Sequence, residues 1–306
     1  MNIRLLLRLI GFGLNTLSWL MPKKASELAL FLFVKPPKPR IRPKEQAFLA
    51  KASQSLMDNV VLYEWGETDR PYVLLAYGWA YNAGRWRHFV PAMLDAGYRV
   101  IAFDPPGHGH APSGTVSLPV NARLMQKIIE LYGRPEVIIG HSFGGASAML
   151  ALSHLEKSLH PARLVLMAAF SEAEGVFREY QRNLGMREGL YQDFVRYTES
   201  VVGGEIASYD LARIAGDMEH VSGLVIHDPN DDMTPFYHAE RYQQLWPGSR
   251  LWATTAGGHH LGTAEITKGI SLFATEARFP AQAERSPRPF SAKHDLTRFW
   301  ASLQEY

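Results

Sequence analysis

The 306-residue sequence contains no cysteine, and this absence removes several classes of function at once. Without thiols the chain forms no disulfide, offers no thiolate ligand to a metal and has no cysteine nucleophile. The absence also fits a reducing compartment, so we expect a cytoplasmic protein. A nucleophile in this chain has to come from another residue type.

The chain also lacks a strong excess of charge of one sign. Its 32 basic and 30 acidic residues leave a net charge of +2, which gives no reason to expect nucleic acid as a partner. The basic residues are unevenly distributed, however. Residues 1–51 contain ten Lys or Arg and two acidic residues, so residues 52–306 are net acidic by six.

No uncharged hydrophobic run reaches the roughly twenty residues that a membrane-spanning helix needs. Arg8 and Asn15 interrupt the apolar stretch within residues 1–21, and a second run at residues 28–34 is short. For residues 1–51 we expect a basic arm of two amphipathic helices and a proline-rich, extended linker at 35–43. Such helices suit an anionic membrane, here the inner membrane surface, or an apolar patch of this chain or of a second subunit.

Residues 52–279 alternate between predicted strands and predicted helices, as is typical of a doubly wound, parallel sheet in one large α/β domain. Short apolar runs predict strands at residues 60–65, 72–77, 98–103, 136–139, 163–168, 223–227 and 250–254. Helices are predicted at residues 87–96, 121–132, 146–152, 236–245 and 263–277.

The alternation stops between about residues 171 and 222, where we expect a small cap of short helices over the carboxyl edge of the sheet. The aromatic residues of this segment either line a substrate pocket or only pack the cap helices together. Residues 280–306 are predicted to form a polar tail, with one helical segment at residues 296–303.

The sequence GHSFGG at residues 140–145 is predicted to present a serine at a strained turn. A β-branched run precedes it and a run of small, helix-forming residues follows, which is the strand, turn and helix context of a nucleophile elbow. Gly140 and Gly144 leave room for the strand and the helix to approach each other. Ser142 is then exposed beside the N–H of Phe143. A serine that only caps a helix is the alternative.

Several local patterns together resemble the α/β-hydrolase superfamily over roughly residues 60–277. They are Tyr77-Gly78-Trp79, the segment DPPGHG at 104–109, the serine turn, residues 227–235 and Gly258-His259. The resemblance implies an α/β fold with a doubly wound, mostly parallel sheet of the α/β-hydrolase type, here with a small helical cap and an N-terminal helical arm.

The same resemblance implies a catalytic triad in the order Ser142, Asp231, His259. It also implies an oxyanion hole made by the backbone N–H groups of Trp79 and Phe143. Asp228 and Asp232 remain alternatives for the acid, and His259 fits the position of the base better than His260. Tyr77 departs from the family, where many members have His at this position.

No cofactor or metal is expected. His108 and His110 lie in a glycine-flanked loop that matches a structural turn of the family, and no further cluster completes a metal site in the sequence.

These residues predict a serine hydrolase, of the carboxylesterase or lipase type, that cleaves a small-molecule ester through an acyl-enzyme. The basic, apolar N-terminus favours lipid-like or hydrophobic acyl esters. An acyltransferase or a thioesterase with the same triad is an alternative, as is a non-catalytic relative that binds a ligand or a partner. Serine at the turn argues against the dehalogenase and epoxide hydrolase branches, for which the resemblance implies a carboxylate nucleophile.

Overall fold

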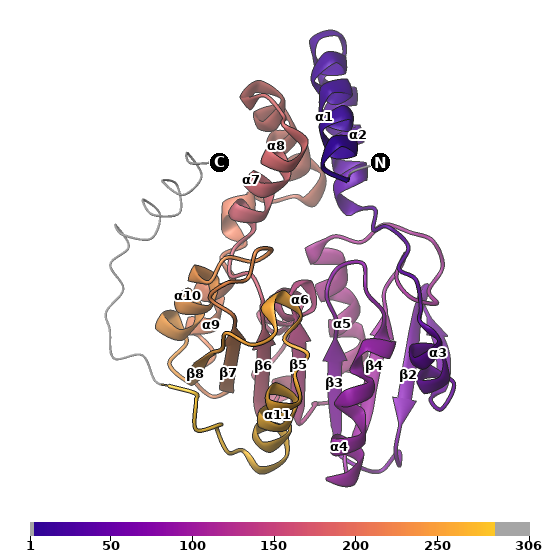
Figure 1. Ribbon diagram of the computed structural model, residues 1–306, viewed down its shortest axis with the longest axis vertical. Helices are drawn as coiled ribbons and strands as arrows, with labels where there is room; N and C mark the ends of the chain where they lie inside the picture. Colours follow the sequence, from indigo (N-terminus) through magenta and orange to yellow (C-terminus); the bar gives the residue numbers. More distant parts are fainter. Residues whose placement is uncertain (1–2, 285–306) are drawn as a thin grey trace.

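The computed structural model describes residues 3–284, and an eight-stranded sheet forms the body of the molecule (Figure 1). The strands are β1 (Ser53–Met57), β2 (Val60–Trp65), β3 (Tyr72–Ala76), β4 (Arg99–Asp104), β5 (Val137–His141), β6 (Arg163–Met167), β7 (Ser222–His227) and β8 (Ser249–Ala253). They are ordered β1-β2-β4-β3-β5-β6-β7-β8 across the sheet. The β1–β2 and β2–β4 pairs are antiparallel, and the five other pairs are parallel.

The doubly wound, mostly parallel sheet predicted from the sequence is confirmed, and each predicted strand is present within two residues of its expected ends. Strand β1 was not predicted, because its sequence is largely polar and four of its five residues are exposed. It pairs with β2 through a tight turn at Asp58 and Asn59, both of which have positive φ. Asp and Asn tolerate this backbone conformation, so the Asp58-Asn59 pair was the sequence signal for a hairpin that would have indicated β1.

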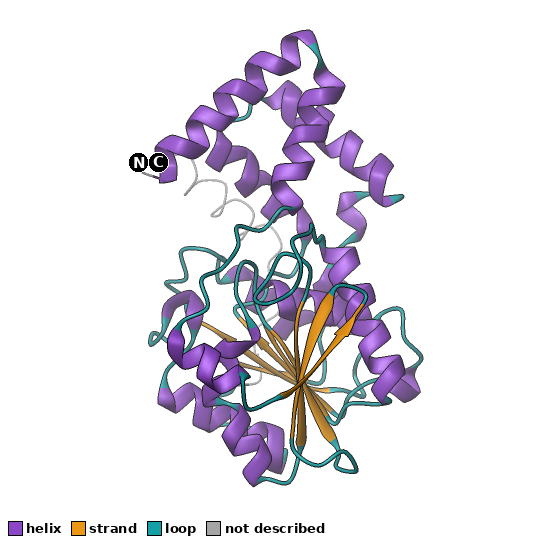
Figure 2. Cartoon of the chain, turned by 90° about the vertical axis from the view of Figure 1, so that its right-hand side faces the viewer, coloured by secondary structure: helices purple, strands orange, loops and turns teal. Residues whose placement is uncertain are grey.

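Helices cover both faces of the sheet, as the view along its edge shows (Figure 2). One face packs against α5 (Leu118–Tyr132), α6 (Phe143–Leu152), α9 (Leu211–Gly216) and α10 (Tyr237–Leu245). The other packs against α3 (Pro43–Leu49), a 3-10 helix at Ala83–His88, α4 (Val90–Asp95) and α11 (Ala264–Glu276). The single helix predicted at residues 87–96 is therefore two shorter elements, and α3 was not predicted.

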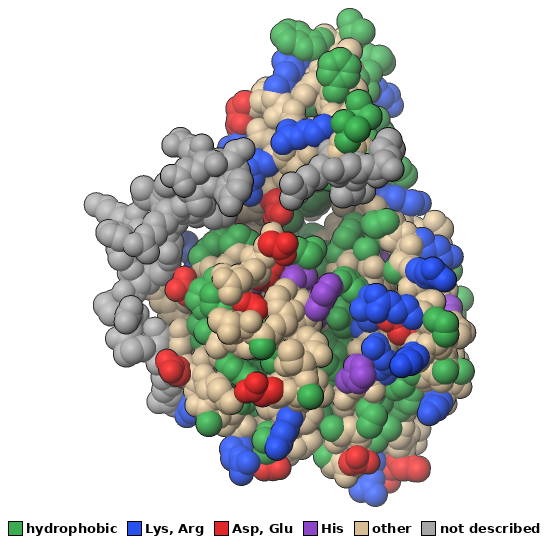
Figure 3. Space-filling view, in the orientation of Figure 1, with side chains coloured by type: hydrophobic (Ala, Val, Ile, Leu, Met, Phe, Trp, Pro, Cys, Tyr) green, Lys and Arg blue, Asp and Glu red, His purple; other side chains and the backbone are tan. Residues whose placement is uncertain are grey.

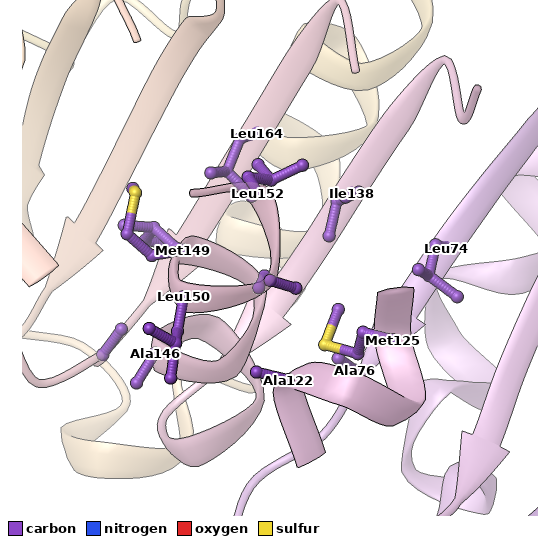
Figure 4. Close-up of a cluster of buried hydrophobic side chains, with 14 of the residues drawn as sticks. Leu74, Ala76, Ala122, Met125, Ile138, Ala146, Met149, Leu150, Leu152 and Leu164 are labelled. Atoms are coloured by element: carbon purple, nitrogen blue, oxygen red, sulfur yellow. The ribbon is translucent and has the colours of Figure 1, made fainter. Parts of the chain in front are cut away.

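The core around α6 fixes the position of the serine turn that precedes this helix. Every residue of α6 is buried, because the helix is apolar on all sides and lies between the sheet and α5. Figure 4 shows Met149 and Leu152 of α6 beside Ile138 and Leu164 of the strands. Each such side chain contributes about 1.5–3 kcal/mol on full burial, so α6 is firmly anchored.

The N-terminal arm and the cap form one helical layer above the carboxyl edge of the sheet (Figures 1 and 2). Helix α1 (Ile3–Leu20) packs against α7 (Ala173–Leu184), and α2 (Pro22–Val34) packs against α8 (Glu188–Val202). Their shared apolar cluster includes Leu14, Ala25, Ala29, Phe177, Leu184, Tyr191 and Phe194. Among the residues that the structure describes, no helix is both long and apolar enough to cross a membrane.

Polar contacts fix the arm to the cap in one register. The side chain of Asn15, within α1, donates to the carbonyl of Gly185 (2.8 Å) and accepts from the N–H of Arg187 (3.0 Å). Asn15 thus provides a hydrogen-bond partner for one carbonyl and one N–H of the turn between α7 and α8. The extended linker expected at residues 35–43 is present over residues 35–42, which form neither helix nor strand. The helical segment expected at residues 296–303 lies outside the described residues.

Two glycines of α1 test this packing, because only one of them lies against the cap. A Cβ on Gly11 would lie 1.7 Å from the carbonyl oxygen of Leu184, whereas a Cβ on Gly13 would meet nothing within 4 Å. Gly to Ala inside a helix ordinarily stabilises by up to about 1 kcal/mol. We therefore expect Gly13→Ala to raise the free energy of unfolding, measured in urea, and Gly11→Ala to lower it by about 1–3 kcal/mol. Equal effects of the two substitutions would contradict the contact between α1 and α7.

Candidate active site

Ser142 occupies a sharp turn between the end of β5 and the start of α6. Its backbone has φ 50° and ψ −120°, a conformation that a residue other than glycine adopts at a cost of about 1–3 kcal/mol. Two hydrogen bonds hold it there. The N–H of Ser142 donates to the carbonyl of Met167 on β6 (2.8 Å), and its own carbonyl accepts from the N–H of Ala146 (3.1 Å).

The glycines around Ser142 are required by the close approach of α6 to the strands. A Cβ on Gly140 would lie 2.5 Å from Cα of Gly145, and a Cβ on Gly144 would lie 2.2 Å from the carbonyl oxygen of Ala76. Neither gap admits a methyl group, because the neighbouring atoms belong to the backbone and cannot rotate away. The strand, tight turn and helix predicted from the sequence are all present.

Asp231 and His259 meet at the same edge of the sheet, from the loops that follow β7 and β8. His259 Nδ1 lies 2.9 Å from Asp231 Oδ2. The other oxygen of this carboxylate accepts the N–H groups of Met233 (2.8 Å) and Thr234 (2.9 Å). Both oxygens are therefore engaged, and the carboxylate has a single orientation toward the imidazole.

The surroundings of Asp231 favour its ionised form. Burial alone would raise the pKa of Asp231, but hydrogen bonds from His227, His259 and the N–H of Thr234 outweigh it and keep the pKa well below its usual value. Because the carboxylate is ionised at neutral pH, it orients His259 with the proton on Nδ1. Nε2 is then the ring nitrogen that can act as a base.

Asp228 and Asp232, the two alternatives for the acid, do not contact the His259 ring. Asp228 accepts the N–H of Asn230 (2.9 Å) through one oxygen and the N–H of Gly258 (2.9 Å) through the other. It thus ties the β7 loop to the β8 loop immediately before His259. Asp232 is exposed, so Asp231 is the carboxylate of the three that contacts the imidazole. The neighbouring ring of His260 contacts the Tyr81 hydroxyl instead (2.8 Å).

The two residues predicted to supply the oxyanion donors, Phe143 and Trp79, line the same cavity as Ser142 and His259. Phe143 is the first residue of α6, so its N–H has no acceptor within the helix. Trp79 follows β3 by three residues, and its ring meets that of Phe143 edge to face, with the centroids 5.3 Å apart.

His108 supports the loop that carries Trp79. The N–H of Ala80, which has a positive φ of 58°, donates to His108 Nε2 at 3.0 Å. His108 Nδ1 faces the carbonyl of Pro106 at 3.2 Å, and burial lowers the pKa of His108, so the ring stays neutral and can accept the Ala80 N–H. Within residues 3–284 there is no group of three His, Asp or Glu residues suited to a metal ion.

His141 is a supporting residue that the sequence did not reveal. His141 directly precedes Ser142, and its ring is fully buried beneath the loop of His259. His141 Nε2 donates a hydrogen bond to the His259 carbonyl (2.8 Å). Burial lowers the pKa of His141 to about 3, so the ring is neutral. Tyr77, the departure from the family pattern, packs against this ring with centroids 4.8 Å apart.

A cavity of about 410 Å³ opens onto Ser142 and His259. Its walls come from the sheet edge, the cap and the arm, and most of its side chains are apolar: Leu32, Phe33, Val34, Trp79, Phe143, Phe170, Val176, Phe177, Met233 and Pro235. Phe177 and Tyr180 also pack against Phe33, with centroids 4.9 and 4.8 Å apart. Phe177 and Tyr180 therefore both line the pocket and pack helices together, the two uses that the sequence left open.

Comparisons with known proteins agree with this architecture. A family model described as the alpha/beta hydrolase fold matches residues 71–215. Epoxide hydrolase A of Mycobacterium tuberculosis is 33% identical over 113 residues, which are 35% of this chain and 34% of that protein. Non-heme chloroperoxidase of Streptomyces lividans is 32% identical over 114 residues, 36% of this chain and 41% of that protein. The chain thus spans less than half the length of these curated relatives.

Solved structures extend the similarity to most of the chain. The monoacylglycerol lipase of Paleococcus ferrophilus superposes with a TM-score of 0.55 over 72% of this chain and 99% of that chain, at 18% identity. At this identity the likeness describes the fold alone.

The three neighbouring aspartates allow a direct test of the site. Because Asp231 alone contacts the imidazole, we expect Asp231→Ala to slow the reaction of Ser142 with a fluorophosphonate probe by about a thousandfold or more. Asp232→Ala, the matched control on the exposed neighbour, is expected to change the rate by less than about twofold. A large loss in Asp232→Ala with none in Asp231→Ala would show that the acid is wrongly assigned.

Proposed function

Residues 71–215 match the alpha/beta hydrolase fold family, and from that premise we propose that the chain is a serine hydrolase of hydrophobic carboxylic esters. The observation that supports the proposal most is the contact of Asp231 with His259, which lines the same cavity as Ser142. A serine at a strained turn, an imidazole and an ionised carboxylate are what acyl transfer requires.

In the first half of the proposed reaction, Ser142 attacks the carbonyl carbon of the ester. Its Oγ forms the new bond while His259 Nε2 takes the hydroxyl proton. The negative charge that develops on the carbonyl oxygen is stabilised by the N–H groups of Trp79 and Phe143, each worth about 3 kcal/mol. The bond to the alcohol then breaks, and His259 returns the proton to the leaving oxygen.

In the second half, water replaces the alcohol. His259 Nε2 takes a proton from the water as its oxygen attacks the acyl carbon, and the bond to Ser142 breaks as the serine regains a proton from His259. Asp231 remains ionised throughout and stabilises the imidazolium that forms in each half. The products are a carboxylic acid and the free enzyme.

The serine nucleophile distinguishes the proposed ester hydrolysis from the reactions that the names of the relatives describe. The relatives named above include an epoxide hydrolase and a chloroperoxidase, so the reaction has to be argued from the side chains of this site. A serine hydroxyl activated by His259 forms an ester with an acyl group, which water then cleaves. The epoxide hydrolase branch is expected to use a carboxylate at this position, where this chain has Ser142.

The pocket supports an apolar acyl group as the substrate. Most of the residues that line it are apolar, and the arm and the cap supply several of them. Burial of apolar surface contributes about 25 cal/mol per Å². The carboxyl group of Glu179 is a polar exception in this wall, and burial raises its pKa above the usual value. A long hydrocarbon chain fills such a pocket better than an acetyl group does.

Hydrolysis of p-nitrophenyl esters tests the proposed reaction. Ser142→Ala and His259→Ala are expected to lower kcat/KM by at least about a thousandfold, because each removes a group that acts in the transition state. Ser153→Ala and His260→Ala are the matched controls and are expected to stay within about twofold of wild type. Full activity in a folded Ser142→Ala variant would rule out the acyl-enzyme.

The same assay with added methanol separates hydrolysis from acyl transfer. The proposal predicts the free acid as the main product, whereas a methyl ester as the main product would identify an acyltransferase.

The apolar wall of the pocket also allows a prediction about the acyl-chain length of the substrate. Val176 lines the cavity, so Val176→Phe is expected to lower kcat/KM for long-chain esters by about tenfold or more and to leave acetate esters nearly unchanged. Val201→Phe, on an exposed position of α8, serves as the control with the same added volume. Equal effects of Val176→Phe on short and long esters would show that the acyl chain binds elsewhere.

A further inference from the structure

The outer side of α1 carries large apolar side chains that stay more than half exposed in the structure of residues 3–284, although the Arg187 guanidinium lies 4.0 Å from the centroid of the Trp19 ring. Leu5, Leu9, Phe12 and Trp19 are 55%, 54%, 72% and 74% exposed. They recur at intervals of three, four and seven residues and therefore lie along one side of the helix. The opposite side packs on the cap through Leu7, Ile10 and Leu14. Helix α1 is thus apolar on two sides, and the structure buries one of them.

This apolar surface continues over the tip of the arm and onto α2. Leu20 and Met21 connect the two helices and are exposed, as are Leu28 and Phe31 on α2. Lys24 and Lys35 lie one turn before and one turn after this α2 pair, and Lys35 Nζ lies 5.7 Å from the Phe31 ring. Figure 3 shows hydrophobic side chains gathered at this end of the molecule, with Lys and Arg side chains beside them.

The charge of residues 1–51 identifies the kind of surface that complements this face. Ten basic side chains stand against two acidic ones, and both acidic groups are already paired. Glu27 accepts from Lys24 at 2.8 Å, and the buried Glu45 lies 2.9 Å from Arg85. No unpaired carboxylate of this segment therefore opposes the approach of a negative partner.

We propose that the outer face of the arm, defined by Leu5, Leu9, Phe12, Trp19, Leu28 and Phe31, docks on an anionic lipid bilayer. Aromatic and leucine side chains bury themselves at the boundary between headgroups and acyl chains, while Lys and Arg pair with lipid phosphates. A second copy of the chain fits this face less well. A symmetric contact between two arms would bring the same positive side chains against each other.

The arm links this docking face to the pocket. The exposed series on α2 ends at Phe31, and the next three residues, Leu32, Phe33 and Val34, line the cavity above Ser142. Phe33 is packed between Phe177 and Tyr180 of the cap, so the arm and the cap share one rigid wall. An acyl ester resident in the bilayer then enters the pocket along the arm. This last step rests on the proposed function, whereas the docking does not.

Sedimentation of the full chain with vesicles tests the docking. We expect the protein to pellet with mixed phosphatidylcholine and phosphatidylglycerol vesicles, to pellet much less with phosphatidylcholine alone, and to be released by high salt. The double variant Leu9→Ser, Phe12→Ser is expected to lower the partition coefficient by about tenfold or more. The control is Leu131→Ser, at a 63% exposed position of α5, which is expected to bind as wild type does.

Charge reversal gives an independent check on the same surface. Lys23 and Lys38 are exposed, and each basic residue near an anionic surface contributes roughly a fivefold gain in affinity. The double variant Lys23→Glu, Lys38→Glu is therefore expected to lose at least about twentyfold in partition to the anionic vesicles.

Hydrolysis measured beside binding separates the docking from the proposed function. In Leu9→Ser, Phe12→Ser, hydrolysis of a short-chain ester in free solution is expected to stay within about twofold of wild type, while hydrolysis of a long-chain ester in vesicles falls with binding. Vesicle binding without any ester hydrolysis would uphold the docking and contradict the proposed function. Wild type that stays in the supernatant with both kinds of vesicle would overturn the docking. Loss of a dimer in the variant, with vesicle binding unchanged, would assign the face to a second copy.

Discussion

The candidate site depends on the close approach of α6 to the carboxyl end of β5. Gly140 and Gly144 permit this approach, since a Cβ at either position would collide with backbone atoms. Ser142 is thereby held at φ 50°, a strain of about 1–3 kcal/mol that the packing of the fully buried α6 offsets. The same turn leaves the N–H of Phe143 without an acceptor inside the helix, as the proposed oxyanion hole requires.

Hydrogen bonds to the backbone on either side of His259, together with one contact to its ring, hold the imidazole in position. Asp228 accepts the N–H of the preceding Gly258, and His141 donates to the carbonyl of His259. Asp231 then fixes the ring itself. The end of β5 and the loops that follow β7 and β8 are therefore tied together by hydrogen bonds to backbone atoms. In the mechanism that we propose, these contacts hold His259 in place before a substrate binds, which limits the reorganisation needed during the reaction.

The local pattern of the sequence was sufficient for the parallel strands and the serine turn, because buried β-branched runs and paired glycines carry strong local signals. Strand β1 is polar and was missed for that reason. The resemblance favoured Asp231 but left Asp228 and Asp232 as alternatives, since the choice depends on which side chain reaches His259. The contribution of α2 to the pocket wall was equally hidden. An apolar helix face specifies burial but not its partner, and here the partners are Phe177 and Tyr180.

In the proposed mechanism, Ser142 carries the acyl group between the two halves of the reaction. The most direct measurement is mass spectrometry of the wild-type protein, quenched in acid during turnover of a long-chain p-nitrophenyl ester and then digested. We expect the mass of the acyl group on the peptide that contains Ser142, and no such mass when Ser142 is replaced by alanine. Rapid hydrolysis with no acyl group on that peptide, or with the group on another serine, would contradict this mechanism.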